Sequence, residues 1–142
     1  MRGPNPLKKF NNLGVITVPY GGTTTQEKFH PGVDIANAEG TPIHAPVDGI
    51  VTNVDESHLG KDNSFGNTVE LKDMSGNLHQ FHHLQRVITK PGQQVRKGRP
   101  IATMGQTGAV YSPSGNEPTN LDYRIVSSYG RYKNPMIYIK NL

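Results

Sequence analysis

The sequence predicts an all-β fold, built from short antiparallel strands that form a sandwich or a barrel-like sheet. Its 142 residues include 16 glycines and 11 prolines, and such frequent turn-forming residues favour many short strands over long helices. Several segments alternate between apolar and polar residues, as half-buried strands do, and no segment has the spacing of a long amphipathic helix. The length fits a single domain.

The first half of the chain contains three expected strands. Residues 1–13 are rich in Pro and Asn and are expected to form an irregular lead-in, so that the domain covers residues 14–142. β-Branched and other apolar residues gather in the expected strands, which cover residues 14–18, 33–36 and 50–54. Turn-forming and polar residues mark the connections, which are Tyr20-Gly21-Gly22, residues 23–28, Val47-Asp48-Gly49 and residues 55–63.

The second half begins with an expected hairpin, in which Ser75-Gly76-Asn77 joins strands at residues 67–73 and 78–84. Residues 105–119 are rich in Gly, Ser, Pro and Asn and are expected to form a long loop. The other expected elements are one helical turn at residues 85–88, turns at Pro91-Gly92 and Lys97-Gly98, strands at residues 101–104 and 121–126, and a short terminal strand at residues 136–139.

Charge and composition limit which kinds of site and which classes of partner the chain can have. The absence of cysteine excludes disulfides, thiolate zinc sites and a cysteine nucleophile. The formal net charge of +4 suits a polyanionic partner, either nucleic acid or an anionic cell-wall polymer. The basic residues are scattered, and the densest stretch, Arg96-Lys97-Gly98-Arg99, is expected to be a solvated turn, so no nucleic-acid interface is predicted. No apolar run predicts a membrane span, and a monomer is the default expectation.

The most informative motif is FHPGVDIA at residues 29–36, which contains His30 and Asp34. An imidazole nitrogen and a carboxylate oxygen are both zinc ligands, and a catalytic zinc uses about three protein ligands and one open position. An isolated pair fits equally well with a surface histidine and a turn aspartate, so the downstream motifs decide between the two.

A second motif, LHQFHHL at residues 78–84, is rich in histidine. Strand alternation predicts that His79, Phe81 and His83 share one face, while Gln80 and His82 share the other. A histidine beside a metal-bound water can orient it, stabilise an oxyanion or carry protons. The alternative is a histidine-rich exposed strand.

The third motif lies where the long loop enters the strand at residues 121–126. Asn120 and Asp122 are expected to share a strand face, with Asp122 as a metal ligand and Asn120 as a hydrogen-bonding group beside it. A turn asparagine followed by a salt-bridged aspartate would explain the pair equally well. Tyr111, in the long loop, is a candidate substrate contact, although a lone loop tyrosine is more often simply packed.

Taken in order, FHPGVDIA, GTPIHAPVDGIV, FHHL and VITKPGQQVRKGRPIATMGQTG resemble the M23 zinc metallopeptidases of the lysostaphin or LytM type. The resemblance covers residues 14–139. It implies a compact antiparallel sheet of the LytM-like, duplicated hybrid-motif type, with long loops around a groove. It also implies a zinc ion held by a His, an Asp and a second His, and a peptidoglycan cross-link or stem peptide as the substrate.

By this resemblance, His30 and Asp34 correspond to the first two zinc ligands. His83 corresponds to the histidine of the family's Tyr-x-His-Leu segment, which assists catalysis. This chain lacks the closing His-x-His motif of the family. Asn120 stands at the catalytic histidine, and Asp122 stands at the zinc-ligand histidine.

This departure predicts weak activity or none. A His/Asp/Asp set carries two negative charges instead of one, which makes a bound water less acidic and favours harder metals. Asn120 cannot exchange a proton near neutral pH, and losing one acid–base group typically costs about 10²–10⁴ in rate. His79 is an auxiliary candidate that could supply the missing imidazole.

Two functions therefore stay open. One is a zinc-dependent endopeptidase that cleaves peptidoglycan peptides with a variant active site. The other is a catalytically degenerate domain that binds a cell-wall peptide or a protein partner, or that forms a structural part of a phage or lysis assembly. The start of the chain has no apolar signal core, so release by lysis, carriage on a virion and a cytoplasmic location all remain possible.

A third interpretation comes from another class of protein. Residues 45–51 and 90–98 also resemble biotinyl or lipoyl carrier domains, which present a modified lysine at a hairpin tip. Here the hairpin tip is Met74-Ser75-Gly76-Asn77 and contains no lysine, and a carrier has no need of the HxxxD motif.

Overall fold

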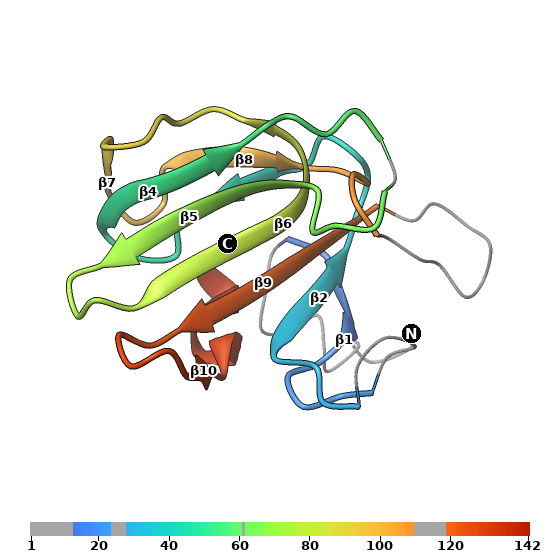
Figure 1. Cartoon of the computed structure of the whole chain (residues 1–142), viewed down its shortest axis with the longest axis horizontal. Helices are drawn as coiled ribbons and strands as arrows, with labels where there is room; N and C mark the ends of the chain where they lie inside the picture. Colours follow the sequence, from blue (N-terminus) through green and yellow to red (C-terminus); the bar gives the residue numbers. More distant parts are fainter. Residues whose placement is uncertain (1–12, 24–27, 61, 110–118) are drawn as a thin grey trace, which may run out of the picture.

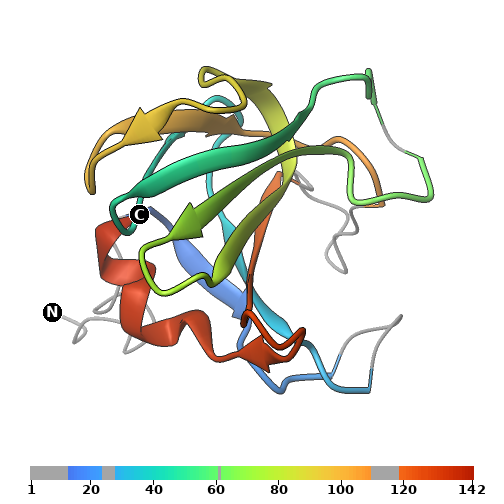
Figure 2. The same cartoon turned by 60° about the vertical axis from the view of Figure 1, so that its left-hand side comes forward.

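The computed structural model describes residues 13–23, 28–60, 62–109 and 119–142. Within these ranges the strands form one curled, antiparallel, ten-stranded sheet (Figures 1 and 2), which confirms the all-β prediction. The strands are β1 (Val15–Val18), β2 (Gly32–Ala36), β3 (Pro42–His44), β4 (Gly49–Asp55), β5 (Asn67–Asp73), β6 (Leu78–Val87), β7 (Gln94–Val95), β8 (Pro100–Met104), β9 (Asn120–Val126) and β10 (Tyr132–Lys133), and the chain ends in a 3₁₀ helix, η2 (Pro135–Asn141).

The sheet runs in the order β1-β2-β9-β6-β5-β4-β7, with β10 paired to β9 and with β8 paired to both β3 and β6. The long strand β6 belongs to two parts of this sheet. Its first residues pair with β5 and β9, whereas its last residues, from Leu84 onward, pair with β8. This change of partner along one strand curls the sheet around its core.

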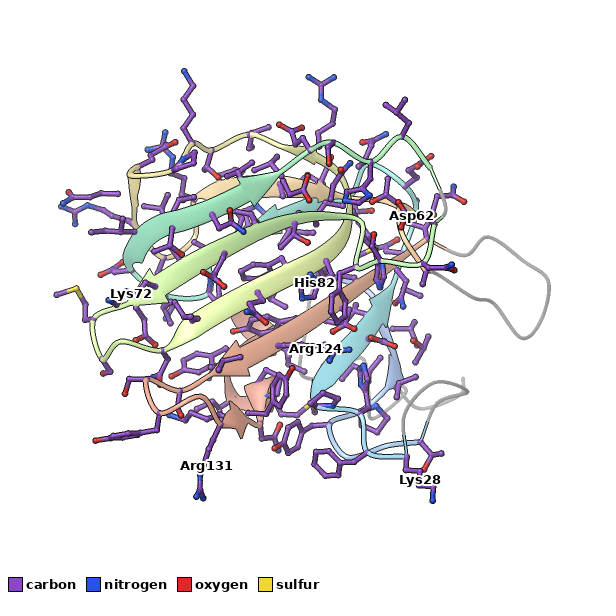
Figure 3. The ribbon with its side chains drawn as sticks, viewed as in Figure 1. Lys28, Asp62, Lys72, His82, Arg124 and Arg131 are labelled. Carbon is purple, nitrogen blue, oxygen red and sulfur yellow. The ribbon has the colours of Figure 1, made fainter. Side chains whose placement is uncertain are left out.

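The two faces of the central strands differ in chemistry. Residues that face the core are fully buried and alternate along their strands, and burial of each stabilises the fold by about 1.5–3 kcal/mol. They include Val33, Ile35, Val69, Leu71, Phe81, Leu121, Tyr123 and Ile125. The opposite face is polar, and Figure 3 shows His82 and Arg124 on it. This polar face carries the candidate site.

Two sequence-based expectations about secondary structure are wrong. Residues 85–88 do not form a helical turn, because Arg86 and Val87 continue β6 and pair with β8. Residues 136–139 do not form a strand. They lie in η2, where the Asn134 side chain accepts a hydrogen bond from the Met136 amide and Pro135 occupies the first turn.

Some expectations fall outside the described residues. Of the expected lead-in only Leu13 is described, and it is buried. The greater part of the long loop, residues 110–118, also lies outside them. The short strand β3 was not among the expected strands. No helix in the described part of the chain is both long enough and apolar enough to span a bilayer.

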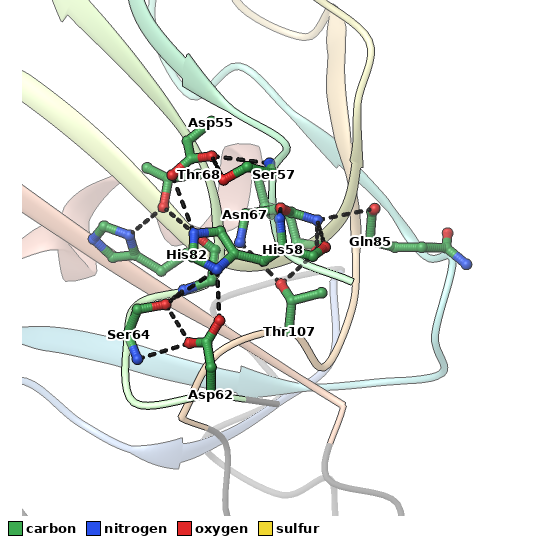
Figure 4. Close-up of polar contacts among 12 residues, drawn as sticks. Asp55, Ser57, His58, Asp62, Ser64, Asn67, Thr68, His82, Gln85 and Thr107 are labelled. Carbon is green, nitrogen blue, oxygen red and sulfur yellow. Dashed lines mark hydrogen bonds and ion pairs between the residues drawn. The ribbon is translucent and has the colours of Figure 1, made fainter. Parts of the chain in front are cut away.

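The loop between β4 and β5 is organised by His58 (Figure 4). The His58 ring lies between two carboxylates, with Nδ1 2.6 Å from Asp62 Oδ2 and Nε2 3.1 Å from Asp55 Oδ2. The Asn67 side chain accepts a hydrogen bond from the His58 amide and donates one to the His58 carbonyl. These contacts tie the loop to the start of β5, and the loop in turn carries Phe65 to the polar face.

We predict that this loop responds to pH through His58. The hydrogen bond that the His58 ring donates to Asp62 is the largest influence, and it raises the pKa of His58 above its ordinary value of 6.5. Because the folded pKa is the higher one, the ion pairs stabilise the loop fully below about pH 6.5 and are lost as the pH rises through the folded pKa. An NMR titration of the His58 ring should give a pKa above 6.5 that falls in Asp62→Asn and is unchanged in Glu39→Gln. Equal His58 pKa values in the wild type and in Asp62→Asn would contradict this assignment.

His79 is predicted to be a structural residue of the core. Its Nδ1 lies 2.7 Å from the Tyr123 hydroxyl and its Nε2 lies 2.9 Å from Asp73 Oδ2, so both ring nitrogens have partners. His79→Ala should lower the free energy of unfolding by about 2–4 kcal/mol, because it opens a cavity and removes both contacts. Urea denaturation measures this loss, with the exposed Ile137→Ala as control. A His79→Ala protein of unchanged stability but reduced zinc content would return His79 to the candidate site.

Candidate metal centre and active site

Three potential metal ligands converge at the edge of the polar face. His30 immediately precedes β2, and Asp34 of β2 lies directly opposite Asp122 of β9, so both carboxylates leave the same face of the sheet. His30 Nε2 lies 3.1 Å from Asp34 Oδ1 and 3.6 Å from Asp122 Oδ2. One donor atom from each residue lies within 4.8 Å of the others. The structure therefore brings together the three residues that the sequence singled out.

The charges of this cluster are coupled. Burial disfavours a charged His30, but its interactions with Asp122 and Asp34 outweigh this and raise the pKa of His30 to about 10. Burial also disfavours a charged Asp122, yet the ion pair with His30 and the hydrogen bonds from Arg124 hold its pKa well below the usual range. Burial, together with the charge of Asp122, raises the pKa of Asp34. Metal binding must therefore displace the proton of His30.

Arg124 is a component of the cluster that the sequence analysis did not single out. Its Nε donates to Asp122 Oδ1 at 2.9 Å, and its terminal Nη2 donates to Asp122 Oδ2 at 2.8 Å. The guanidinium also lies over the ring of Phe65, 4.7 Å from its centroid. The available signal was the two-residue spacing of Asp122 and Arg124 on one strand, which places them on the same face. The salt-bridged aspartate that the sequence left open as an alternative is thus present.

Gly32 makes room for this pair. A Cβ added at Gly32 would lie 2.7 Å from the Cγ of Arg124 and 2.9 Å from Oδ1 of Asp122. The glycine that follows Pro31 in the motif therefore permits the close approach of β2 and β9 at the site.

His83 departs from the strand alternation that the sequence predicted. Its φ of 65° is the one positive φ among the described non-glycine residues. Regular alternation would place His83 with Phe81 and His79 on the core face, but this backbone conformation breaks the alternation. The prediction of a shared face for these three residues is therefore wrong. His83 Nδ1 donates to the Thr107 carbonyl at 2.8 Å, which leaves Nε2 of the neutral ring without a proton.

His82 is a second histidine of the polar face, which the sequence analysis assigned no role. It lies opposite Asp122 on the neighbouring strand and stacks on Phe65, with ring centroids 4.2 Å apart. The Thr68 hydroxyl lies 2.9 Å from His82 Nδ1 and 3.1 Å from the Gly66 carbonyl, so it orients the His82 ring. Burial lowers the pKa of His82 to about 4, so its ring is neutral near pH 7.

The remaining candidates occupy different places. Asn120 begins β9 and pairs with Ala36, two residues from Asp122 on the same face. His79 lies on the opposite, core face with its partners Tyr123 and Asp73. Tyr111 lies outside the described residues, so its predicted substrate contact stays a prediction.

The donor set fits a zinc ion. Ligands at bonds of about 2.0–2.2 Å in a tetrahedral site lie roughly 3.3–3.6 Å apart, close to the separations from His30 Nε2. Asp34 Oδ1 is near His30 Nε2 but makes no hydrogen bond, as expected for donors aimed at a common point. In the described part of the chain, four buried side-chain polar atoms lack a hydrogen-bond partner, and all belong to this face and its rim: His30 Nδ1, Asp34 Oδ1, His82 Nε2 and Asn120 Oδ1. Such a cluster indicates a ligand or ordered water.

Comparisons with known proteins agree with this geometry. A model of the peptidase family M23 matches residues 28–135. The peptidoglycan DD-endopeptidase ShyC of Vibrio cholerae is 36% identical over 112 residues, which are 79% of this chain and 23% of ShyC. The murein hydrolase activator NlpD of Salmonella typhimurium is 31% identical over 138 residues, which are 97% of this chain and 31% of NlpD. The chain thus spans less than a third of the length of either relative.

A solved structure supports the same relationship. The catalytic domain of the prophage-encoded M23 protein EnpA from Enterococcus faecalis, as its A109H mutant, superposes with a TM-score of 0.70 at 26% identity. The match covers 89% of this chain and 92% of that domain. The family match, the relatives and the shared fold lead to one conclusion: the chain belongs to peptidase family M23.

Proposed function

We propose that this chain is a zinc-dependent hydrolase domain that cleaves peptide bonds in peptidoglycan, at the cell wall. The observation that carries the proposal is the convergence of His30, Asp34 and Asp122 beside two histidines, His82 and His83. Membership of the M23 family and the similarity to ShyC support peptidoglycan as the substrate class.

The roles of the residues follow from their contacts. His30, Asp34 and Asp122 would hold the zinc ion, which would supply a Lewis acid for the scissile carbonyl. His83 is fixed through Nδ1 by the Thr107 carbonyl, so its Nε2 is the atom that accepts a proton from the attacking water and returns it to the leaving amine. The Asn120 amide positions water or a substrate peptide group by hydrogen bonds, since it cannot exchange a proton.

Asn120 stands on β9 where the family has a histidine, so one imidazole is missing there. His82, on the neighbouring strand β6, brings another imidazole to the polar face. Its buried Nε2 has no protein partner, and its ring orientation is fixed by Thr68 and Phe65. We assign His82 the task of forming a hydrogen bond through Nε2 on the polar face, with water or with the substrate.

A second function is favoured by two specific observations. Asn120 replaces an acid–base group, and both oxygens of Asp122 already accept hydrogen bonds from Arg124. These features suit a domain that binds a peptidoglycan peptide or a protein partner without cleaving it. The 31% identity to NlpD, a murein hydrolase activator, is consistent with this alternative.

We predict that the protein supplied with zinc holds about one ion per chain, and that Asp34→Asn loses it, because the variant removes a charged ligand. Elemental analysis after desalting measures the stoichiometry. Glu39→Gln, a change to an exposed carboxylate outside the site, should retain the metal. Zinc retained at full stoichiometry by Asp34→Asn would place the metal elsewhere.

We predict that His83→Ala lowers kcat by about 10²–10⁴ with a smaller change in KM, because it removes an acid–base group. The assay digests purified peptidoglycan and quantifies the released peptides by chromatography. His44→Gln is the matched control, because His44 lies outside the site and contacts the Leu142 carbonyl. Peptidoglycan that binds the zinc-loaded protein but is never cleaved would reject the hydrolase and support the binding domain.

A further inference from the structure

The position of Arg124 changes the charge of the proposed metal centre. Both oxygens of Asp122 are engaged by the guanidinium, at 2.9 and 2.8 Å, and both residues are only 4% exposed. A guanidinium cannot lose its proton in a protein, so this is a permanent buried cation. With a neutral His30, the two carboxylates and the guanidinium leave the cluster with one net negative charge.

Arg124 is also held in place from several sides. It lies over Phe65 at 4.7 Å and near Tyr132 at 6.0 Å from the ring centroids. Phe65 is itself stacked on His82, and the backbone of Gly32 approaches the Arg124 side chain closely enough to exclude a Cβ. A bidentate pair in such packing is a fixed part of the site, unlike a mobile surface ion pair.

We propose that Arg124 is a built-in counter-cation of the centre, which keeps the carboxylate cluster stable without metal and weakens the binding of a metal ion there. A buried carboxylate with no compensating cation is strongly destabilising, and Arg124 supplies that cation to Asp122. A divalent metal on Asp122 Oδ2 would lie within a few ångströms of the guanidinium, and the two positive charges repel in this partly buried environment.

The proposal rests on the proposed metal centre and deepens it. Arg124 controls metal affinity through its contact with the ligand Asp122, without contacting the metal itself. The zinc-free protein is a stable folded state, because His30 and Arg124 together offset the charges of Asp34 and Asp122.

Zinc competition titration against a chromophoric chelator tests this assignment, with Arg124→Gln as the main variant. Glutamine removes the charge but can still donate a hydrogen bond to Asp122. We expect zinc affinity to rise by at least about tenfold, because a nearby unit charge is removed. Arg124→Lys, which keeps the charge, should bind zinc within about threefold of the wild type, because the repulsion remains. Arg131→Gln, at an exposed arginine outside the cluster, is the control and should match the wild type.

Thermal denaturation in chelator gives a second, independent readout. The zinc-free Arg124→Gln protein should melt at a lower temperature than the wild type, and zinc should restore more stability to the variant than to the wild type. If Arg124→Gln fails to fold in chelator, recovery of the folded state on adding zinc supports the proposal, and failure to recover overturns it.

The other outcomes separate this proposal from the proposed function. Equal or weaker zinc affinity in folded Arg124→Gln overturns the role of Arg124 and leaves the metal centre intact. Absence of zinc binding in every variant overturns the metal centre and this proposal together. Tighter zinc binding in Arg124→Gln without peptidoglycan cleavage supports the proposal and rejects only the hydrolase.

Discussion

Two carboxylates, that of the half-buried Asp34 and that of the buried Asp122, face each other across neighbouring antiparallel strands, and the chemistry of the site depends on how their charge is compensated. The compensation comes from His30 and Arg124, which contact these carboxylates at ion-pair distances. Charged groups taken out of water are stable only when they are paired in good geometry. The close pairing of β2 and β9 at Gly32, and the aromatic packing of Arg124, provide that geometry.

The second constraint is the orientation of the histidines on β6. A regular strand would turn His83 into the core, and its positive φ breaks that pattern. Thr107 supports this conformation, because its carbonyl accepts from His83 and its hydroxyl both donates to the Leu84 carbonyl and accepts from the Asn67 amide. The result is a polar face on which Thr68 orients the His82 ring and the Thr107 carbonyl orients the His83 ring, so that the site is pre-organised for ligand or substrate.

Most of the fold could be predicted from the sequence, because alternating strands and turn residues are local signals. The grouping of His30, Asp34 and Asp122 could also be predicted, from the HxxxD motif and from the family resemblance of the closing strand. The roles of Arg124 and His82 could not, since both depend on which strands pair and in which register. The irregular backbone at His83 could not be predicted, because a single residue with a positive φ does not change the alternation of apolar and polar residues in the sequence. The extra negative charge expected from Asp122 is present, but Arg124 cancels it, so with a neutral His30 the cluster has the charge of the His/Asp/His set implied by the family resemblance.

We infer that a metal binds among His30, Asp34 and Asp122 while Arg124 remains on Asp122. Anomalous diffraction from crystals grown with a saturating concentration of zinc would locate the ion. We expect a zinc peak within bonding distance, about 2.0–2.2 Å, of His30 Nε2 and of one oxygen of each aspartate, with the guanidinium still bidentate on Asp122. A peak elsewhere on the polar face, or a structure in which Arg124 has swung away from Asp122, would contradict it.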